Sequence, residues 1–225
     1  MKFTYYGHAC FMVETAGKKL LFDPFITGNA LAKDIDVKKI EADYILVSHG
    51  HGDHVGDMAA IAQNTGATVI AAAEVAGWAH QNGCEKVHGI NFGSMQFDFG
   101  KLRFVPASHS SSMPDGSYGG NPGGFVISND EGAFYYAGDT GVITDMQLIP
   151  RFVKLSFAVL PIGGNYTMDA EEAILAADFI QCDKIVGVHF DTFEVIRIDH
   201  EAVAKQFAAA GKTLILPEIG KEIAL

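Results

Sequence analysis

The six residues from His49 to His54 bring three imidazoles and one carboxylate close together in the chain. Their order is His49-Gly50-His51-Gly52-Asp53-His54. Imidazole and carboxylate are ligand types that suit Zn, Mn, Fe and Ni. The two intervening glycines let the backbone bend tightly between the ligands. Such a pattern arises by chance in roughly one chain in a thousand. The segment therefore predicts a metal site rather than a solvated polar turn.

Three further polar residues stand at the ends of predicted buried strands, namely His109, Asp139 and His189. Each comes just after a short apolar run, where functional side chains are often carried. Any one of them alone is more often a satisfied core or surface group. Together with the His49–His54 segment they indicate enough ligands for two metal ions.

Composition narrows the class of substrate and partner. The chain has 27 acidic and 16 basic residues and a formal net charge of -11. A duplex-binding protein needs a basic face to displace counterions, and no run of Lys or Arg provides one. The longest apolar stretch, Ala67–Ala79, is broken by Glu74 and is shorter than the roughly 18 residues that span a bilayer. We therefore expect a small-molecule substrate, with neither nucleic acid nor membrane as a partner.

Cysteine usage bears on the compartment. The three cysteines are widely separated, form no C-x-x-C pair and do not suit a disulfide framework. No charged leader followed by a long apolar stretch opens the chain, so no signal peptide is expected. A reducing, cytoplasmic setting follows as the simpler expectation. The oligomeric state is left open, a homo-oligomer included.

Short strands and a few helices are expected to position these ligands. The apolar alternation and turn residues predict strands at Phe3–Tyr6, Cys10–Glu14, Leu20–Phe22, Ala42–Ser48, Thr68–Ala71, Met95–Phe99, Leu102–Pro106, Phe125–Ser128, Ala133–Tyr136, Phe157–Leu160, Lys184–Val188 and Thr213–Leu216. Helical spacing predicts helices at His54–Asn64, Glu74–Asn82, Thr144–Lys154, Asp169–Gln181 and His200–Ala210. Thr167 is expected to cap the helix that starts near Asp169.

The order of these elements predicts an α/β (α+β) fold of two mixed β-sheets packed together with helices outside. No linker divides the chain, so a single domain is expected over 1–225. From Ser108 to Gly124 the chain is rich in Ser, Gly and Pro. A loop of that length is unusual in a compact domain and tends to be functional.

These motifs, in this order, resemble the metallo-β-lactamase superfamily over nearly the whole chain. The matching segments are Ser48–His54, Ser108-His109-Ser110, Gly138-Asp139-Thr140 and Val188-His189. Asp23–Asn29, Gly7–Phe11 and Gly164–Met168 are similar to its short metal-dependent hydrolases related to ascorbate-6-phosphate lactonase. The resemblance implies a four-layer αββα sandwich.

The same resemblance implies a role for each ligand. His49, His51 and His109 would bind one metal ion, and Asp53, His54 and His189 a second. Asp139 would bridge the two. The ions would be divalent, with zinc the first choice and Mn, Ni or Fe also suited. Two such ions can share a water and lower its pKa towards neutrality, so Asp53 and Asp139 are counted as catalytic as well as metal-binding.

His8 is a further catalytic candidate, because the resemblance places a histidine of this turn near the metals. It could donate a proton to the leaving group or hold a substrate anion. A structural, hydrogen-bonding histidine at a turn is an equally good interpretation. His80, His88 and His200 have no ligand-like context and are interpreted as surface residues. A serine nucleophile among Ser108–Ser112 is disfavoured, because no G-x-S-x-G elbow is present.

Departures from particular branches of the superfamily narrow the activity. Asp139 stands where β-lactamases of the commonest type carry cysteine, and His51 where flavo-diiron oxidoreductases usually carry glutamate. The helical extension of glyoxalase II and the basic arm of tRNA-processing nucleases have no counterpart here. The expectation is a hydrolase of a small polar or anionic ester, lactone or phosphoester. The alternative is a non-hydrolytic metal-binding or redox protein on the same fold.

Overall fold

The strands carry apolar residues on both faces, as strands covered on both sides must. In β10 (Gly132–Tyr136), Phe134 and Tyr136 join the apolar cluster shared by the two sheets, whereas Ala133 and Tyr135 join the cluster on the helical side. Successive side chains of a strand point to opposite faces. A strand of this composition is stable only in the middle of a layered structure.

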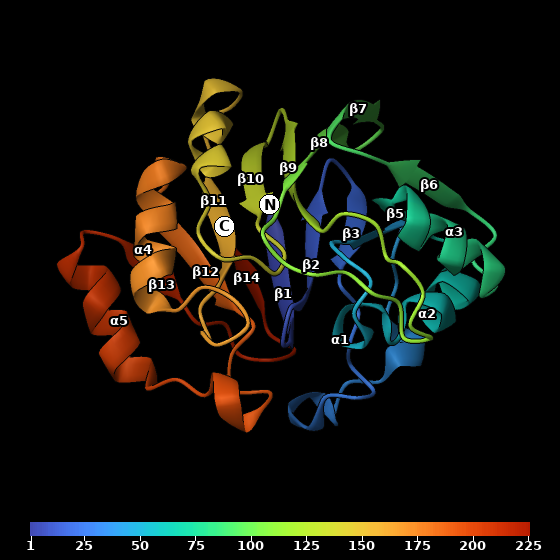
Figure 1. Cartoon of the computed structure of the whole chain (residues 1–225), viewed down its shortest axis with the longest axis horizontal. Coiled ribbons are helices and arrows are strands. Elements are labelled where there is room, and N and C mark those ends of the chain that lie inside the picture. The colour runs from blue at the N-terminus through green and yellow to red at the C-terminus, as the bar shows by residue number, and fades with distance from the viewer.

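The computed structural model describes all 225 residues, which form two seven-stranded sheets (Figure 1). The first sheet has the order β14-β1-β2-β3-β4-β5-β6 and the second the order β13-β12-β11-β10-β9-β8-β7. The strands of the first sheet are β1 (Lys2–Gly7), β2 (Cys10–Thr15), β3 (Lys18–Phe22), β4 (Tyr44–Val47), β5 (Thr68–Ala72), β6 (Val87–Ile90) and β14 (Glu222–Ala224). Besides β10, those of the second are β7 (Gly93–Phe97), β8 (Gly100–Pro106), β9 (Gly123–Asn129), β11 (Phe157–Pro161), β12 (Lys184–Val188) and β13 (Thr213–Ile215).

Helices cover the outer face of each sheet. In Figure 1, α2 (Met58–Thr65) and α3 (Ala73–Gln81) lie on the side of the first sheet, and α4 (Ala170–Phe179) and α5 (His200–Ala209) on the side of the second. The shorter helices are α1 (Gly52–Val55), η1 (Ala30–Ala32), η2 (Val37–Lys39), η3 (Thr144–Arg151) and η4 (Glu194–Ile196). The expected four-layer αββα sandwich is thereby confirmed.

Strand direction brings the candidate ligands to one edge of the sandwich. In the first sheet β1 and β3 are each antiparallel to β2, and β4 is parallel to β3. In the second sheet β8 and β10 are each antiparallel to β9, and β10, β11 and β12 run parallel. The residues that follow β1, β3 and β4 therefore share one edge, as do those that follow β8, β10 and β12.

Some local expectations differ from the structure. The helix expected over His54–Asn64 is broken into α1 and α2, because the backbone N–H of Asp57 donates to Pro24 O at 2.9 Å rather than to a carbonyl of the preceding turn. The run after Thr144 is a 3₁₀ helix that ends at Arg151, next to Pro150. Thr167 does not cap α4. Asp169 does, in a capping box with Glu172.

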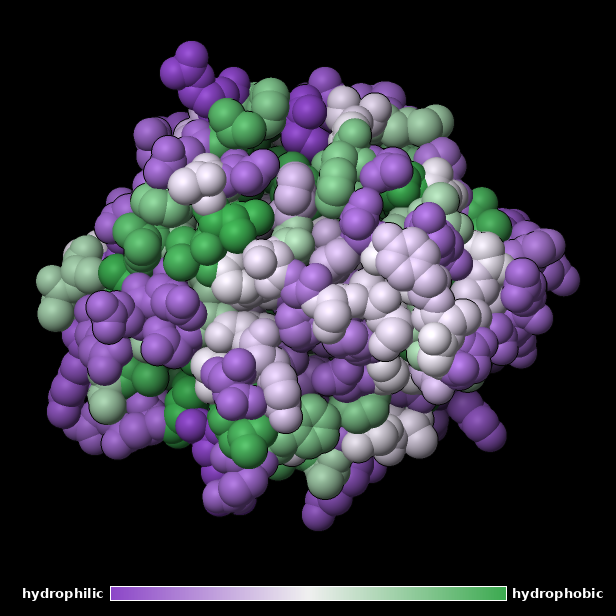
Figure 2. Space-filling view, in the orientation of Figure 1, coloured by the Kyte–Doolittle hydropathy of each residue, from purple (hydrophilic) through white to green (hydrophobic).

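Polar and apolar groups are mixed on the face seen in Figure 2, with apolar side chains gathered in front of η3 and α4. Leu148 of η3, Phe152 directly after it and Leu175 of α4 are exposed. Exposed apolar side chains of this kind are ordinary on a protein surface. None of the helices combines the length and apolar character that crossing a bilayer requires. All three cysteines are buried and unpaired.

Candidate metal centre

The first group of candidate ligands comes from the ends of β4 and β8. His49 and His51 follow β4, and His51 occupies the N-cap of α1. His109 lies three residues after the end of β8. One ring nitrogen of each imidazole lies within 4.8 Å of the others, and His49 Nε2 is 3.0 Å from His51 Nδ1. The three rings thus converge on one point, as the ligands of a single ion do.

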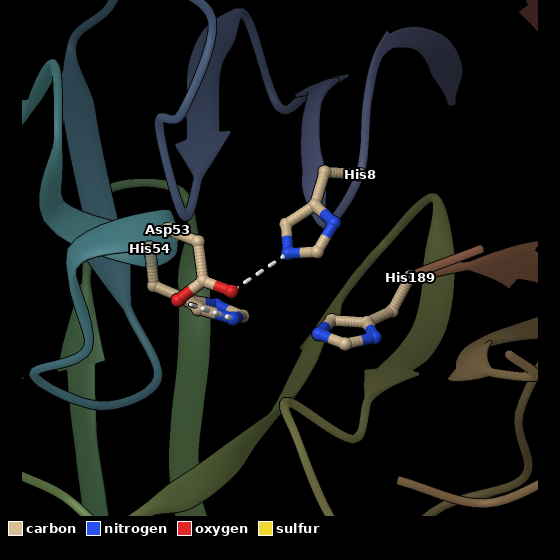
Figure 3. Close-up of side chains that lie close together, drawn as sticks. All are labelled: His8, Asp53, His54 and His189. Carbon is tan, nitrogen blue, oxygen red and sulfur yellow. Dashed lines mark hydrogen bonds and ion pairs between the residues drawn. The ribbon is translucent and has the colours of Figure 1, made fainter. Parts of the chain in front are cut away.

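The second group consists of His8 after β1, Asp53 and His54 of α1, and His189 after β12. Each offers one nitrogen or oxygen within 4.8 Å of the others. Figure 3 shows the His8 ring pointing at Asp53, where Nε2 lies 3.2 Å from Oδ2. The rings of His54 and His189 face the same space from opposite sheets (Figure 3).

Asp139 lies between these two groups, and its carboxylate is almost fully buried. Its Oδ2 atom is surrounded by four Nε2 atoms, 3.0 Å from His189, 3.3 Å from His54, 3.6 Å from His109 and 4.0 Å from His49. One carboxylate oxygen therefore faces imidazoles of both groups.

Burial keeps most of these imidazoles neutral. It lowers the pKa of His49, His51 and His109 below the ordinary imidazole value. Burial also lowers the pKa of His8 to about 4, although the hydrogen bond to Asp53 opposes this shift. A neutral imidazole keeps a nitrogen lone pair free, which is the form that binds a metal.

His54 and the two carboxylates are charged in the metal-free protein. Burial opposes a charge on His54, but Asp139 and Asp23 outweigh it and raise the His54 pKa well above its ordinary value. Burial also opposes the charge on Asp139, yet His54 and His189 hold its pKa well below the ordinary range. The pKa of Asp53 is lowered as well, because the His8 hydrogen bond and the charge of His54 outweigh burial. The centre therefore presents two ionised carboxylates to a cation.

The pattern of unpaired atoms fits a metal at this place. Asp139 Oδ1 is buried without a hydrogen-bond partner, and the buried His54 Nε2 makes no hydrogen bond and has only the ion-pair contact with Asp139 Oδ2 at 3.3 Å. Buried polar atoms without partners are rare in folded proteins and costly. An imidazole nitrogen and a carboxylate oxygen are the donor types that a divalent ion of the zinc series accepts. The residues present thus fit a bound divalent metal ion.

A second layer of hydrogen bonds orients the ligands from behind. The fully buried Asp23 accepts hydrogen bonds from His54 Nδ1 at 2.8 Å, from Ser48 Oγ at 2.6 Å and from Tyr136 Oη at 2.5 Å. With Nδ1–H donated to Asp23, His54 turns Nε2 towards Asp139, which is the arrangement typical of metal-bound histidine. Ser48 Oγ also lies 3.0 Å from His49 Nδ1.

No role is predicted for Asp23 from the sequence, although a signal for one is present there. Asp23 directly follows the end of β3, at the same sheet edge as the residues that follow β4. It has a left-handed φ of 39°, which is uncommon for a residue other than glycine. A carboxylate at a strand end is the same pattern that singled out Asp139.

Every sequence-predicted site residue lies in one of the two groups or between them: His8, His49, His51, Asp53, His54, His109, Asp139 and His189. The remaining histidines lie outside both groups. His80 and His200 are exposed as expected, and His88 is half-buried.

Comparison with known proteins agrees with the fold and with the family that the sequence resembles. Residues 18–190 match the model of the β-lactamase superfamily domain. A protein of Flavobacterium johnsoniae named UPF0173 metal-dependent hydrolase is 53% identical over the full length of both chains. The solved structure of Igni18, a metallo hydrolase from the archaeon Ignicoccus hospitalis, is 35% identical with a TM-score of 0.88, covering 99% of this chain and 97% of that one.

A more distant structure, an isothiocyanate hydrolase from Delia radicum gut bacteria, has a TM-score of 0.81 at 19% identity, covering 100% of this chain and 99% of that one, and shows a shared fold. The fold and the His/Asp cluster define a metal-dependent hydrolase of the metallo-β-lactamase type. Within this class the chain belongs to the UPF0173 family of metal-dependent hydrolases. The prediction of a metal-dependent hydrolase of this superfamily is confirmed.

Proposed function

We propose that the protein binds two divalent metal ions and hydrolyses a small polar or anionic ester, lactone or phosphoester. His49, His51 and His109 would bind the first ion, and Asp53, His54 and His189 the second, with Asp139 bridging them. The observation that carries this proposal is the position of Asp139 Oδ2, which lies 3.0 to 4.0 Å from imidazole nitrogens of both groups.

When bound, two such ions would supply an activated water and polarise the bond to be cleaved. The chain's own contribution is to hold the ligands in place before substrate arrives. Asp23 fixes the ring of His54, and Ser48 approaches the ring of His49. Zinc is the first choice for this donor set, and Mn, Ni and Fe also suit it.

His8 would transfer a proton to the leaving group. As a neutral imidazole it donates Nε2–H to Asp53 Oδ2 at 3.2 Å, and its Nδ1 accepts a hydrogen bond from Thr192 Oγ1 at 3.1 Å. These two bonds hold the ring beside the three proposed ligands of the second ion. A side chain held within reach of the reacting bond can act as general acid or base.

Charge supports a small anionic or polar substrate. Asp53 and Asp139 carry two negative charges, against the four positive charges of two divalent ions, so the loaded centre would be net positive. The protein around it has a net charge of -11, which disfavours a long polyanion. We therefore include in the proposal that neither nucleic acid nor membrane is a partner. The buried, unpaired cysteines support a reducing, cytoplasmic location.

The test is a substrate panel of lactones, phosphodiesters and thioesters, assayed after loading with Zn, Mn, Ni or Fe. We expect hydrolysis in at least one class, and its loss in Asp139→Ala. Asp130→Ala, in the exposed turn between β9 and β10, serves as the matched control and should keep full activity. A single bound iron with oxygen-dependent chemistry and no hydrolysis would contradict the proposal.

A further inference from the structure

The Ser- and Gly-rich segment after β8 is not an open loop. Its middle folds back as a small hairpin, in which Gly119 N donates to Ser111 O at 3.1 Å and Met113 N donates to Ser117 O at 2.8 Å. Gly116 takes a φ of 83° at the turn. We call residues 111–119 the metal-side hairpin, because it starts two residues after His109.

One hydroxyl joins the base of this hairpin to the histidine motif. Ser111 Oγ accepts the backbone N–H of Gly50 at 3.1 Å and donates to Gly119 O at 2.8 Å. Gly50 stands between His49 and His51 and is buried. The bond therefore ties together the two chain segments that supply all three imidazoles of the first group.

The contact around this bond is closely packed. A Cβ atom on Gly50 would lie 2.5 Å from Met113 Sδ, and one on Gly119 would lie 2.4 Å from Ser111 Oγ. Met113 is itself buried. A Cβ on Gly50 would also lie 3.2 Å from Ser112 O, so the hairpin backbone packs directly against the backbone between His49 and His51.

The tip of the hairpin has a separate anchor. Trp78 of α3 donates its indole N–H to Asp115 Oδ2 at 2.8 Å, and Ser117 Oγ donates to Asp115 Oδ1 at 2.6 Å. Both bonds are exposed and lie away from the ligands. They hold the tip even if the bond at the base is lost, so a change at Ser111 can be separated from general loss of the hairpin.

We propose that Ser111 is a positioning residue for metal binding, which keeps His109 in register with His49 and His51. Without its hydroxyl the buried Gly50 N–H has no acceptor, and the His109 segment loses its bond to the histidine motif. This inference rests on the proposed function, since it takes those three histidines as the ligands of one ion.

The test compares Ser111→Thr with Ser111→Val, two side chains of nearly equal shape that differ in the hydroxyl group. The affinity for Zn²⁺ and Co²⁺ is measured by competition with a chelator, and the Tm of each metal-free variant is recorded. Loss of a residue that supports metal ligands typically weakens binding about 10–100-fold. We expect a loss of that size for one equivalent in Ser111→Val and Ser111→Ala, and near-normal affinity in Ser111→Thr.

Ser117→Ala is the matched control, because it removes a hydroxyl from the same hairpin but not from the base, and its affinity should be unchanged. The fluorescence of Trp78, the only tryptophan, reports whether the tip stays in place in each variant. Equal affinities of the Val and Thr variants would overturn the role of Ser111. A wild-type protein that binds no metal would instead overturn the proposed function, so the two failures are distinguishable.

Discussion

The backbone N–H of His189 donates to the carbonyl oxygen of His8 at 2.7 Å, and both residues have a left-handed φ of 56°. The bond joins the turn after β1 to the end of β12, and it brings the two rings within 4.2 Å, centroid to centroid. Such backbone conformations cost about 1–3 kcal/mol each and are concentrated at functional sites. The bond thus holds His189, a candidate ligand, and His8, a candidate proton donor, in a fixed position relative to each other.

Replacing His8 by asparagine tests its role without adding backbone strain, because asparagine tolerates the left-handed conformation. If His8 transfers a proton, kcat should fall about 100-fold or more, while both metal ions stay bound. Metal content and kcat are measured on the same preparation. Loss of one metal equivalent would show instead that His8 is a ligand.

Asp23→Asn should weaken metal binding about 10–100-fold, because His54 loses the carboxylate that fixes its ring. The variant should also lose about 1–3 kcal/mol of stability for a buried donor left unpaired, since Ser48 and Tyr136 share the same carboxylate. Chelator competition and denaturant unfolding measure the two effects. Asp34→Asn, at an exposed position in the segment between η1 and η2, should show neither.

The metal-free protein should become less stable in acid. Folding lowers the pKa of His49, His51 and His109, and that of His8 to about 4. The imidazoles of the unfolded chain have pKa values of about 6.5. As the pH falls below that value, the unfolded chain therefore binds more protons than the folded protein. The stability from these groups is present above that value and is lost as the pH falls. His54 has the opposite sign, because its raised pKa contributes stability that is lost as the pH rises.

Below a pH of about 6.5, His54 is protonated in both the folded and the unfolded state and adds no pH dependence, so the Tm in the presence of chelator should fall as the pH is lowered from about 6.5 to about 4. Thermal melts across this range measure the slope. His8→Asn should make the slope shallower, because one of the lowered groups is removed. A Tm that stays constant or rises towards acid would contradict the assignment of buried neutral imidazoles.

Gly138→Ala tests how tightly Asp139 is held. Gly138 has a φ of 64°, and a Cβ there would lie 2.7 Å from Gly123 O and 2.9 Å from Ser48 Cβ. A left-handed alanine alone costs about 1–2 kcal/mol, and the close contacts should add about 1–3 kcal/mol. Gly211→Ala is the matched control, with a φ of 73° and no neighbouring atom within 4 Å. Equal losses of unfolding free energy in the two variants would show that the contacts at Gly138 do not matter.

Much of the fold and the ligand positions could be predicted because their signals are local. Strands that are buried on both faces, such as β11, consist of consecutive apolar residues in the sequence. The ligands stand either in one contiguous segment or within three residues of the end of a strand. Parallel strands then bring their ends to one edge, so His109, Asp139 and His189 meet without any further signal in the chain.

The features that were missed depend on contacts between distant segments. β14 has only three residues, Glu222–Ala224, and forms by backbone pairing with β1. The metal-side hairpin is held by hydrogen bonds from Gly50 and Trp78, which are distant from it in the sequence. The role of Asp23 comes from meeting His54, which follows the neighbouring strand β4, and Tyr136, which belongs to the other sheet.

Counting bound ions tests the two-ion proposal most directly. Wild-type protein and the variants His109→Asn, Asp53→Asn and Asp139→Ala are loaded with zinc, freed of excess metal and analysed for metal per chain. We predict two equivalents in the wild type, about one in each of the first two variants, and weakened binding of both ions in Asp139→Ala. One equivalent in the wild type, with His109→Asn and Asp53→Asn each abolishing it, would contradict the proposal.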